Sequence, residues 1–189
     1  MKKIFESLGN DLRGLILEEE SLDRDDNWLY LNTLWYKPKP RKIYSSILVE
    51  FIEGTTGLPE RQVILALDGA ASTHGITPVV SAVADKLRSK LVIWKESFPV
   101  SVSESWILPP RVEKNKECII VQDVFSNGSS LPRVAEDINY LEWKVNKIYS
   151  LVWVDRNEER FYENLEMFKN MVNCGDAFEA LCLLNLSDI

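Results

Sequence analysis

Short runs of apolar residues recur along the chain at nearly equal intervals, and this rhythm limits the folds open to it. Four runs begin roughly 30 residues apart, the length of a strand–helix–strand unit, at residues 63–67, 91–94, 118–121 and 149–154. Continuous apolar residues, rather than alternating ones, are typical of strands buried on both faces of a sheet. A last run at 181–184 can add an edge strand. We therefore expect an α/β protein with a doubly wound, mostly parallel sheet of about five strands.

The segments outside these runs carry the helical period that such a fold requires. Apolar residues at intervals of three and four predict one helix near the start of the chain, a second after residue 40, a third after Pro78 and a fourth after Ser130. The residues that indicate these helices are Phe5, Leu8, Leu12 and Leu15; Ile43, Ile47, Leu48 and Phe51; Val79, Val80, Val83, Ala84 and Leu87; and Leu131, Val134, Ile138 and Leu141.

One connection departs from the rhythm. Residues 97–116 contain Pro99, Pro109 and Pro110 and show no helical face, and a loop of roughly 20 residues is too long for a plain connector. Loops of this length are often lids over a binding site, but a β-ribbon or another structural excursion explains the composition equally well. Since nothing else divides the chain, we expect residues 1–189 to form one domain.

The charge balance argues against whole classes of partner. The chain has 29 acidic and 22 basic residues and a formal charge of −7, whereas a nucleic-acid binder needs a basic face. No apolar run is long enough to span a membrane, and the first residues lack the apolar stretch of a signal peptide. Three widely spaced cysteines and a single histidine give no metal-binding pattern. We therefore expect a cytoplasmic protein without nucleic-acid or membrane partners.

The stretch after the third apolar run has the features of an anion site. The predicted strand ends in Gln122 and Asp123, and a turn of small polar residues then leads into a helix: Ser126, Asn127, Gly128, Ser129 and Ser130. Unpaired amides at a helix start attract anions, and an Asn-Gly pair allows the positive φ that lets successive amides converge on one phosphate. Asp123 lies at the carboxyl end of a strand, where ligands of open α/β sheets bind, and can accept from sugar hydroxyls.

Two other interpretations of this stretch need weighing. An ordinary turn with a helix cap would show the same small polar residues and bind nothing. A P-loop is excluded, because the sequence GxxxxGK[ST] is absent. The acid at the strand end, within a regular parallel-sheet pattern, favours the anion site over the plain turn.

Residues 118–130, CIIVQDVFSNGSS, resemble the phosphoribosyl-pyrophosphate motif of type I phosphoribosyltransferases: a hydrophobic strand, two acids, two variable residues and a small-residue loop. The resemblance implies that family's fold, with a small N-terminal hood segment within residues 1–40. It assigns the ribose hydroxyls to Gln122 and Asp123 and the 5′-phosphate to residues 126–130. Gln122 departs from the pattern, because the family has an acid there.

Other segments resemble the orotate phosphoribosyltransferases of that family. Lys95, after the second core strand, matches a catalytic lysine, and Arg156, in Val-Asp-Arg, matches the arginine that faces the orotate carboxylate. Arg156 can also be interpreted as a solvated charge at the end of a strand. His74 can also be interpreted as a histidine with a purely structural role. The turn after the first core strand resembles the pyrophosphate loop, whose contacts would be Ser72, Thr73, His74 and Gly75.

The sequence differs from the orotate phosphoribosyltransferases at two places that concern the pyrophosphate. The negative charge of this leaving group must be stabilised during the reaction. Trp94 stands where these enzymes have an arginine, and residues 97–104 lack the lysine and histidine of their loop. The cations that remain later in this loop, and can compensate, are Arg111, Lys114 and Lys116.

The resemblance implies a homodimeric enzyme that transfers phosphoribosyl from phosphoribosyl pyrophosphate to a base, orotate first, with Mg²⁺ held mainly through the substrate. The departures leave open a second hypothesis, a non-catalytic relative that binds a nucleotide or phosphoribosyl pyrophosphate as a regulator. A third is transfer to a purine, since Asn127-Gly128 also resembles the phosphate loop of xanthine phosphoribosyltransferases.

Overall fold

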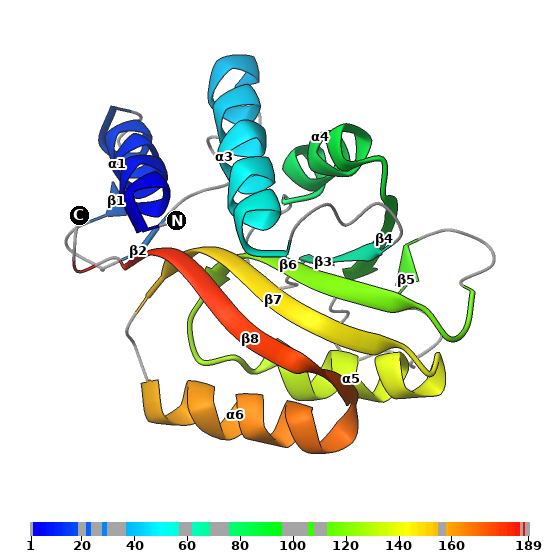
Figure 1. The fold of residues 1–189 in the computed structure, drawn as a ribbon. Coiled ribbons are helices and arrows are strands. Elements are labelled where there is room, and N and C mark those ends of the chain that lie inside the picture. Colours follow the sequence, from blue (N-terminus) through cyan, green and yellow to red (C-terminus); the bar gives the residue numbers. More distant parts are fainter. Residues whose placement is uncertain are drawn as a thin grey trace.

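Figure 1 shows the fold in a computed structural model of the chain. A six-stranded sheet lies between two layers of helices, and a separate two-stranded ribbon lies near the N-terminal helix. The structure describes residues 2–18, 22–23, 28–29, 37–56, 62–68, 76–95, 106–107, 113–154, 158–185 and 187.

The main sheet has the strand order β5-β4-β3-β6-β7-β8. Five of its strands run parallel, and β5 pairs with β4 in the antiparallel sense. The predicted parallel sheet of about five strands is therefore confirmed. The bounds are β3 (Val63–Asp68), β4 (Lys90–Lys95), β5 (Trp106–Ile107), β6 (Glu117–Phe125), β7 (Lys144–Trp153) and β8 (Asn173–Asn185), and the ribbon consists of β1 (Leu22–Asp23) and β2 (Trp28–Leu29).

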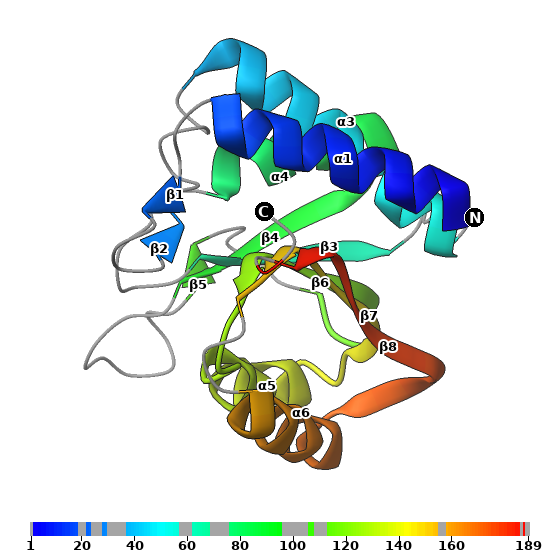
Figure 2. The ribbon, with the colours of Figure 1, turned by 90° about the vertical axis from the view of Figure 1, so that its left-hand side faces the viewer.

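Helices cover both faces of the sheet, as Figures 1 and 2 show. One layer contains α1 (Lys2–Glu18), α3 (Pro38–Thr56) and α4 (Thr77–Leu87), and the other contains α5 (Ser130–Tyr140) and α6 (Glu158–Met171). All four predicted helices are present. One more helix, α6, was not predicted, although Phe161, Leu165 and Phe168 give it a buried face.

The central strand β3 shows why its sequence lacks alternation. Ile64 and Ala66 pack with the buried residues of α1, α3 and α4, whereas Val63, Leu65 and Leu67 pack with those of α5 and α6. All five side chains are at most 4% exposed. Because both faces of the strand are covered, each of these five positions is apolar, as the continuous run predicted.

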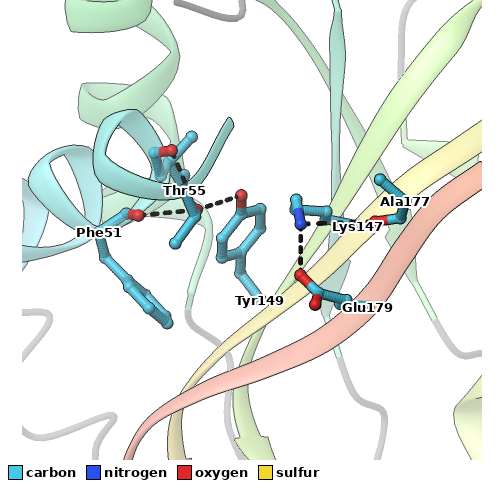
Figure 3. A network of polar contacts seen from close by, with 7 residues as sticks. Phe51, Thr55, Lys147, Tyr149, Ala177 and Glu179 are labelled. Carbon is cyan, nitrogen blue, oxygen red and sulfur yellow. Dashed lines mark hydrogen bonds and ion pairs between the residues drawn. The ribbon is translucent and has the colours of Figure 1, made fainter. Parts of the chain in front are cut away.

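Polar contacts tie the α3 layer to β7 and β7 to β8 (Figure 3). The hydroxyl groups of Thr55, in the last turn of α3, and Tyr149, on β7, lie 2.7 Å apart. The ring of Phe51 meets that of Tyr149 edge-on at 5.4 Å between centroids. On the neighbouring strand pair, Lys147 donates to Glu179 at 2.6 Å. The first two contacts hold β7 against the end of α3, and the third joins β7 to β8.

Several boundaries differ from the predictions. β7 begins at Lys144 rather than at residue 149, and β8 begins at Asn173 rather than at 181, because their first halves are polar and only partly buried. The short strand β5 lies within the 97–116 stretch. Most of that stretch, including residues 97–105, lies outside the described residues, so the lid and the N-terminal hood stay predictions.

The three cysteines are free thiols in different surroundings. Burial raises the pKa of Cys118 far above its ordinary value and that of Cys182 to about 12, and it also raises the pKa of the half-buried Cys174. Because the thiolate is the nucleophile, all three should react slowly at pH 8. We expect timed iodoacetamide labelling, followed by peptide mass spectrometry, to modify Cys174 first and the other two only after unfolding in urea. Rapid labelling of Cys118 in the folded protein would contradict the packing of β6.

Candidate phosphate-binding site

The predicted phosphate loop lies where β6 gives way to α5. The strand ends at Phe125 and the helix begins at Ser130, so residues 126–129 form the turn between them. Phe125 is in register with Trp153 of β7, and its carbonyl oxygen accepts from the amide of Val154 at 2.8 Å. The turn therefore starts from a firmly paired point at the carboxyl edge of the sheet.

Local hydrogen bonds set the shape of this turn. The side-chain oxygen of Asn127 accepts from the amide of Ser129 at 3.1 Å, which is an Asx turn. Gly128 then adopts φ 67°, a left-handed conformation that glycine reaches without steric cost. The amide of Leu131 donates to the carbonyl oxygen of Gly128 at 3.0 Å and closes the first turn of the helix.

Several hydrogen-bond donors of the turn and of the helix start are not used by the described residues. Within the part of the chain that the structure describes, the amides of Gly128 and Ser130 and the hydroxyls of Ser126, Ser129 and Ser130 have no hydrogen-bond partner. The three serines are half-buried. Backbone amides and hydroxyls gathered at the start of a helix are suited to an anion with several oxygens, such as a phosphate group.

Asp123 and Gln122, at the end of β6, differ in how deeply they are buried. Asp123 is half-buried, and its carboxylate accepts from the amide of Val124 at 2.8 Å. The Asp123 carbonyl oxygen accepts from the hydroxyl of the buried Ser150 at 3.1 Å, which anchors its backbone to β7. Gln122 is only 5% exposed, and its side-chain nitrogen donates to the Val124 carbonyl oxygen at 3.2 Å. Asp123 is thus the more exposed of the two residues at the sheet edge, while burial limits the access of a ligand to Gln122.

Helix α6 contacts the turn through two of its residues. The side-chain nitrogen of Asn164 donates to the carbonyl oxygen of Asn127 at 2.7 Å. A Cβ atom placed on Gly128 would lie 3.1 Å from Cδ2 of Phe161, so the two surfaces are in close contact. The sequence prediction missed both α6 residues. The spacing of Phe161, Leu165 and Phe168 was the signal that could have revealed the helix.

Comparison with known proteins rests on structure alone, since no protein-family model and no curated protein match the chain. Orotate phosphoribosyltransferase from Aeropyrum pernix is similar with a TM-score of 0.65 and 14% identity over 94% of both chains. The orotate phosphoribosyltransferase of Mycobacterium tuberculosis H37Rv, in complex with inorganic phosphate, gives a TM-score of 0.62 and 14% identity over 94% of this chain and 90% of that one.

An adenine phosphoribosyltransferase from Thermoanaerobacter pseudethanolicus covers 84% of this chain and 87% of its own, with a TM-score of 0.58 and 14% identity. This chain has the type I phosphoribosyltransferase fold. In that fold the carboxyl ends of the parallel strands share one edge, and the predicted site segments all start from that edge.

Among those segments the structure places some and not others. Lys95 is the last residue of β4, where its backbone pairs with Asp68 at the end of β3. Residues 72–75 follow β3 and Arg156 follows β7, but all of these lie outside the described residues. Their contacts with pyrophosphate or a base therefore stay predictions.

Trp94, which stands at the arginine position of the orotate enzymes, is part of the core of this phosphoribosyltransferase fold. Its side chain is 3% exposed, and its indole nitrogen donates to the Asp137 carboxylate of α5 at 2.8 Å. Asp137 is itself 4% exposed. The residue therefore braces β4 against α5 and offers no cation to a ligand.

The late-loop cations Lys114 and Lys116 do not reach the site, which corrects the expectation that they compensate. Both precede β6, at the edge of the sheet opposite its carboxyl end. Lys116 pairs with Glu113 at 2.7 Å, and Lys114 lies 3.6 Å from Glu142. Hydrogen bonds and charge from the ammonium groups of Lys116 and Lys90 lower the pKa of Glu113 to about 2. Arg111 lies outside the described residues.

Features elsewhere do not extend this site. Among the described residues there is no cluster of three or more His, Cys, Asp or Glu side chains that could hold a metal. None of the described helices combines the length and apolar character needed to cross a membrane. A groove of about 660 Å³ lies between α1 and α3, and none of the predicted site residues line it.

Proposed function

We propose that this chain binds phosphoribosyl pyrophosphate and transfers its phosphoribosyl group to a nitrogenous base, with orotate the first base to test. The observation that carries the proposal is a set of donors that find no partner among the described residues, the amides of Gly128 and Ser130 and the hydroxyls of Ser126, Ser129 and Ser130, close in sequence to the Asp123 carboxylate. The likeness to phosphoribosyltransferases of known structure supports it, because their fold places ligands at this edge.

The chemistry divides among the chain's own groups. The amides of Gly128 and Ser130 and the serine hydroxyls would hold the 5′-phosphate, and Asp123 would accept hydrogen bonds from the ribose hydroxyls. The base attacks the anomeric carbon of the ribose while the bond from that carbon to the pyrophosphate oxygen breaks. Lys95 and residues 72–75 would stabilise the departing pyrophosphate, and Arg156 would pair with a carboxylate on the base.

A Mg²⁺ ion fits this arrangement when it is bound mainly through the substrate. Asp123 supplies a hard oxygen ligand at the edge where the sugar would lie, and Mg²⁺ commonly binds through one or two carboxylates together with substrate phosphates. When bound, the ion would neutralise charge that develops on the pyrophosphate. A homodimer belongs to the same proposal, by likeness to the family.

A second candidate function is regulatory binding without turnover. It is favoured by the burial of Trp94 and by the pairing of Lys114 and Lys116 with acids far from the site, which leave few cations for the leaving group. Losing one such donor can cost about 2.7–4 kcal/mol of transition-state stabilisation. A protein of this kind would bind phosphoribosyl pyrophosphate or a nucleotide and respond to its concentration.

One assay distinguishes these candidates. The protein is incubated with Mg²⁺, phosphoribosyl pyrophosphate and orotate, adenine or xanthine, and both base consumption and pyrophosphate release are followed. Consumption of one base establishes transfer and identifies the base. Calorimetric binding of phosphoribosyl pyrophosphate without turnover of any base supports the regulatory function, and the absence of both binding and turnover rejects the two together.

Two substitutions test the site itself. We expect Ser129→Ala to weaken phosphoribosyl-pyrophosphate binding about three- to tenfold, because one neutral donor is lost, and Asp123→Asn to weaken it by about ten- to a hundredfold, because a charged acceptor is lost. Calorimetry gives the dissociation constants. Ser81→Ala, which removes a hydroxyl bonded within α4, is the control and should bind like the wild type. Unchanged binding by Asp123→Asn would remove the ribose contact from the proposal.

A further inference from the structure

The peptide group that joins Asn127 to Gly128 is held from outside the motif. Its carbonyl oxygen accepts from the side-chain nitrogen of Asn164 on α6 at 2.7 Å. Asn164 is half-buried and lies 37 positions away in the sequence, so this bond joins the turn to a separate helix. The turn's own Asx bond, from the Ser129 amide to the Asn127 side chain, leaves that carbonyl oxygen available.

Fixing the carbonyl oxygen also fixes the neighbouring amide. A trans peptide group is planar, and its C=O and N–H bonds point in opposite directions. With the Asn127 oxygen turned toward α6, the Gly128 N–H points away from that helix. This amide has no hydrogen-bond partner among the described residues.

Helix α6 is a rigid support for this bond. Phe161, one turn before Asn164, packs its ring against those of Phe125 at 5.0 Å and Trp153 at 4.6 Å between centroids. Phe125 and Trp153 are the last residues of β6 and β7. The helix is therefore anchored to the end of β6, from which the turn begins, and to the end of the neighbouring β7, and the Asn164 amide is held where the Asn127 oxygen meets it.

We propose that Asn164 is a positioning residue for the phosphate loop, which holds the Asn127–Gly128 peptide so that the Gly128 amide donates to the bound phosphate. This role rests on the proposed function. Without the Asn164 donor the peptide can rotate, and a flipped Asn127–Gly128 peptide would present the Asn127 carbonyl oxygen to the phosphate in place of the Gly128 N–H. The Ser130 amide belongs to the helix and does not depend on Asn164 in this way.

The test uses nitrogen-15 labelled protein and ribose 5-phosphate. In the wild type we expect the Gly128 and Ser130 amide resonances both to shift downfield on titration. Asn164→Leu, which keeps the volume but removes the donor, should weaken binding about tenfold and abolish the Gly128 shift while the Ser130 shift remains. Asn164→Asp, nearly isosteric and facing the carbonyl oxygen with a carboxylate, should have the same effect. Glu163→Leu on the exposed side of α6 is the matched control.

The outcomes separate the two levels of the proposal. If the wild type does not bind ribose 5-phosphate, the proposed function and the role of Asn164 both fail. If the wild type binds and both Asn164 variants retain the affinity and the Gly128 shift, only the role of Asn164 is overturned. Thermal unfolding of each variant is recorded, and equal loss of the Gly128 and Ser130 shifts would indicate general damage to the loop and also overturn the specific role.

Discussion

Gly128→Val should abolish the binding of phosphoribosyl pyrophosphate and lower the free energy of unfolding by about 2–5 kcal/mol. The native φ of 67° costs a residue with a Cβ atom about 1–2 kcal/mol, and a β-branched side chain is among the least tolerant. The new Cβ would also lie 3.1 Å from Cδ2 of Phe161, so α6 or the turn must shift. Either shift moves the amides that would hold the phosphate.

Calorimetry measures the binding of this variant, and urea unfolding measures its stability. Gly14→Ala is the matched control. Gly14 lies in the interior of α1, and a Cβ atom added to it meets nothing within 4 Å. It should leave binding unchanged and stabilise the helix by up to about 1 kcal/mol. A Gly128→Val protein that binds within twofold of the wild type would show that the turn's shape is irrelevant to the ligand.

Trp94→Leu should lower the free energy of unfolding by about 3–5 kcal/mol, because a large buried side chain is replaced by a smaller one. Trp94→Phe should cost about 1–3 kcal/mol, since it retains an aromatic ring but removes the donor to Asp137. The Asp137 carboxylate is 4% exposed, so water cannot readily replace that donor.

Urea unfolding of the two Trp94 variants and of Trp94→Phe combined with Asp137→Asn tests this contact. The double variant should cost less than the sum of the two single ones, because Trp94→Phe removes the donor of this hydrogen bond and Asp137→Asn replaces its charged acceptor with a weaker, neutral one. Met167→Ala, at a half-exposed position of α6, is the control and should change stability by no more than about 0.5 kcal/mol. Strictly additive losses would contradict the Trp94–Asp137 bond.

The sheet was predictable because its central strands have a simple environment. β3, β4 and β6 are covered by helices on both faces, so residues that point to either face, such as Ile64 and Leu65, must be apolar. An apolar run therefore marks each of these strands. The Asn-Gly pair likewise predicted a turn with positive φ, and Gly128 has it. Both the strands and the turn depend on the residues of one short segment, so each can be recognised in the sequence of that segment.

Features that depend on distant partners were harder to predict. The first half of β7 is polar because Lys144 and Lys147 pair with acids on the adjacent strands, Glu117 and Glu179, and such pairs cannot be read from one segment. Asn164 touches the turn only because α6 folds back beside it. The burial of Trp94 likewise depends on a distant partner, Asp137 of α5, which lies 43 residues further along the chain.

A crystal structure with phosphoribosyl pyrophosphate and Mg²⁺ bound would decide whether this turn holds a sugar phosphate. We expect the 5′-phosphate within about 3 Å of the Gly128 and Ser130 amide nitrogens, with the ribose hydroxyls against Asp123. Ligand bound at another place on the molecule, or a turn that stays empty at saturating ligand, would contradict the proposed site.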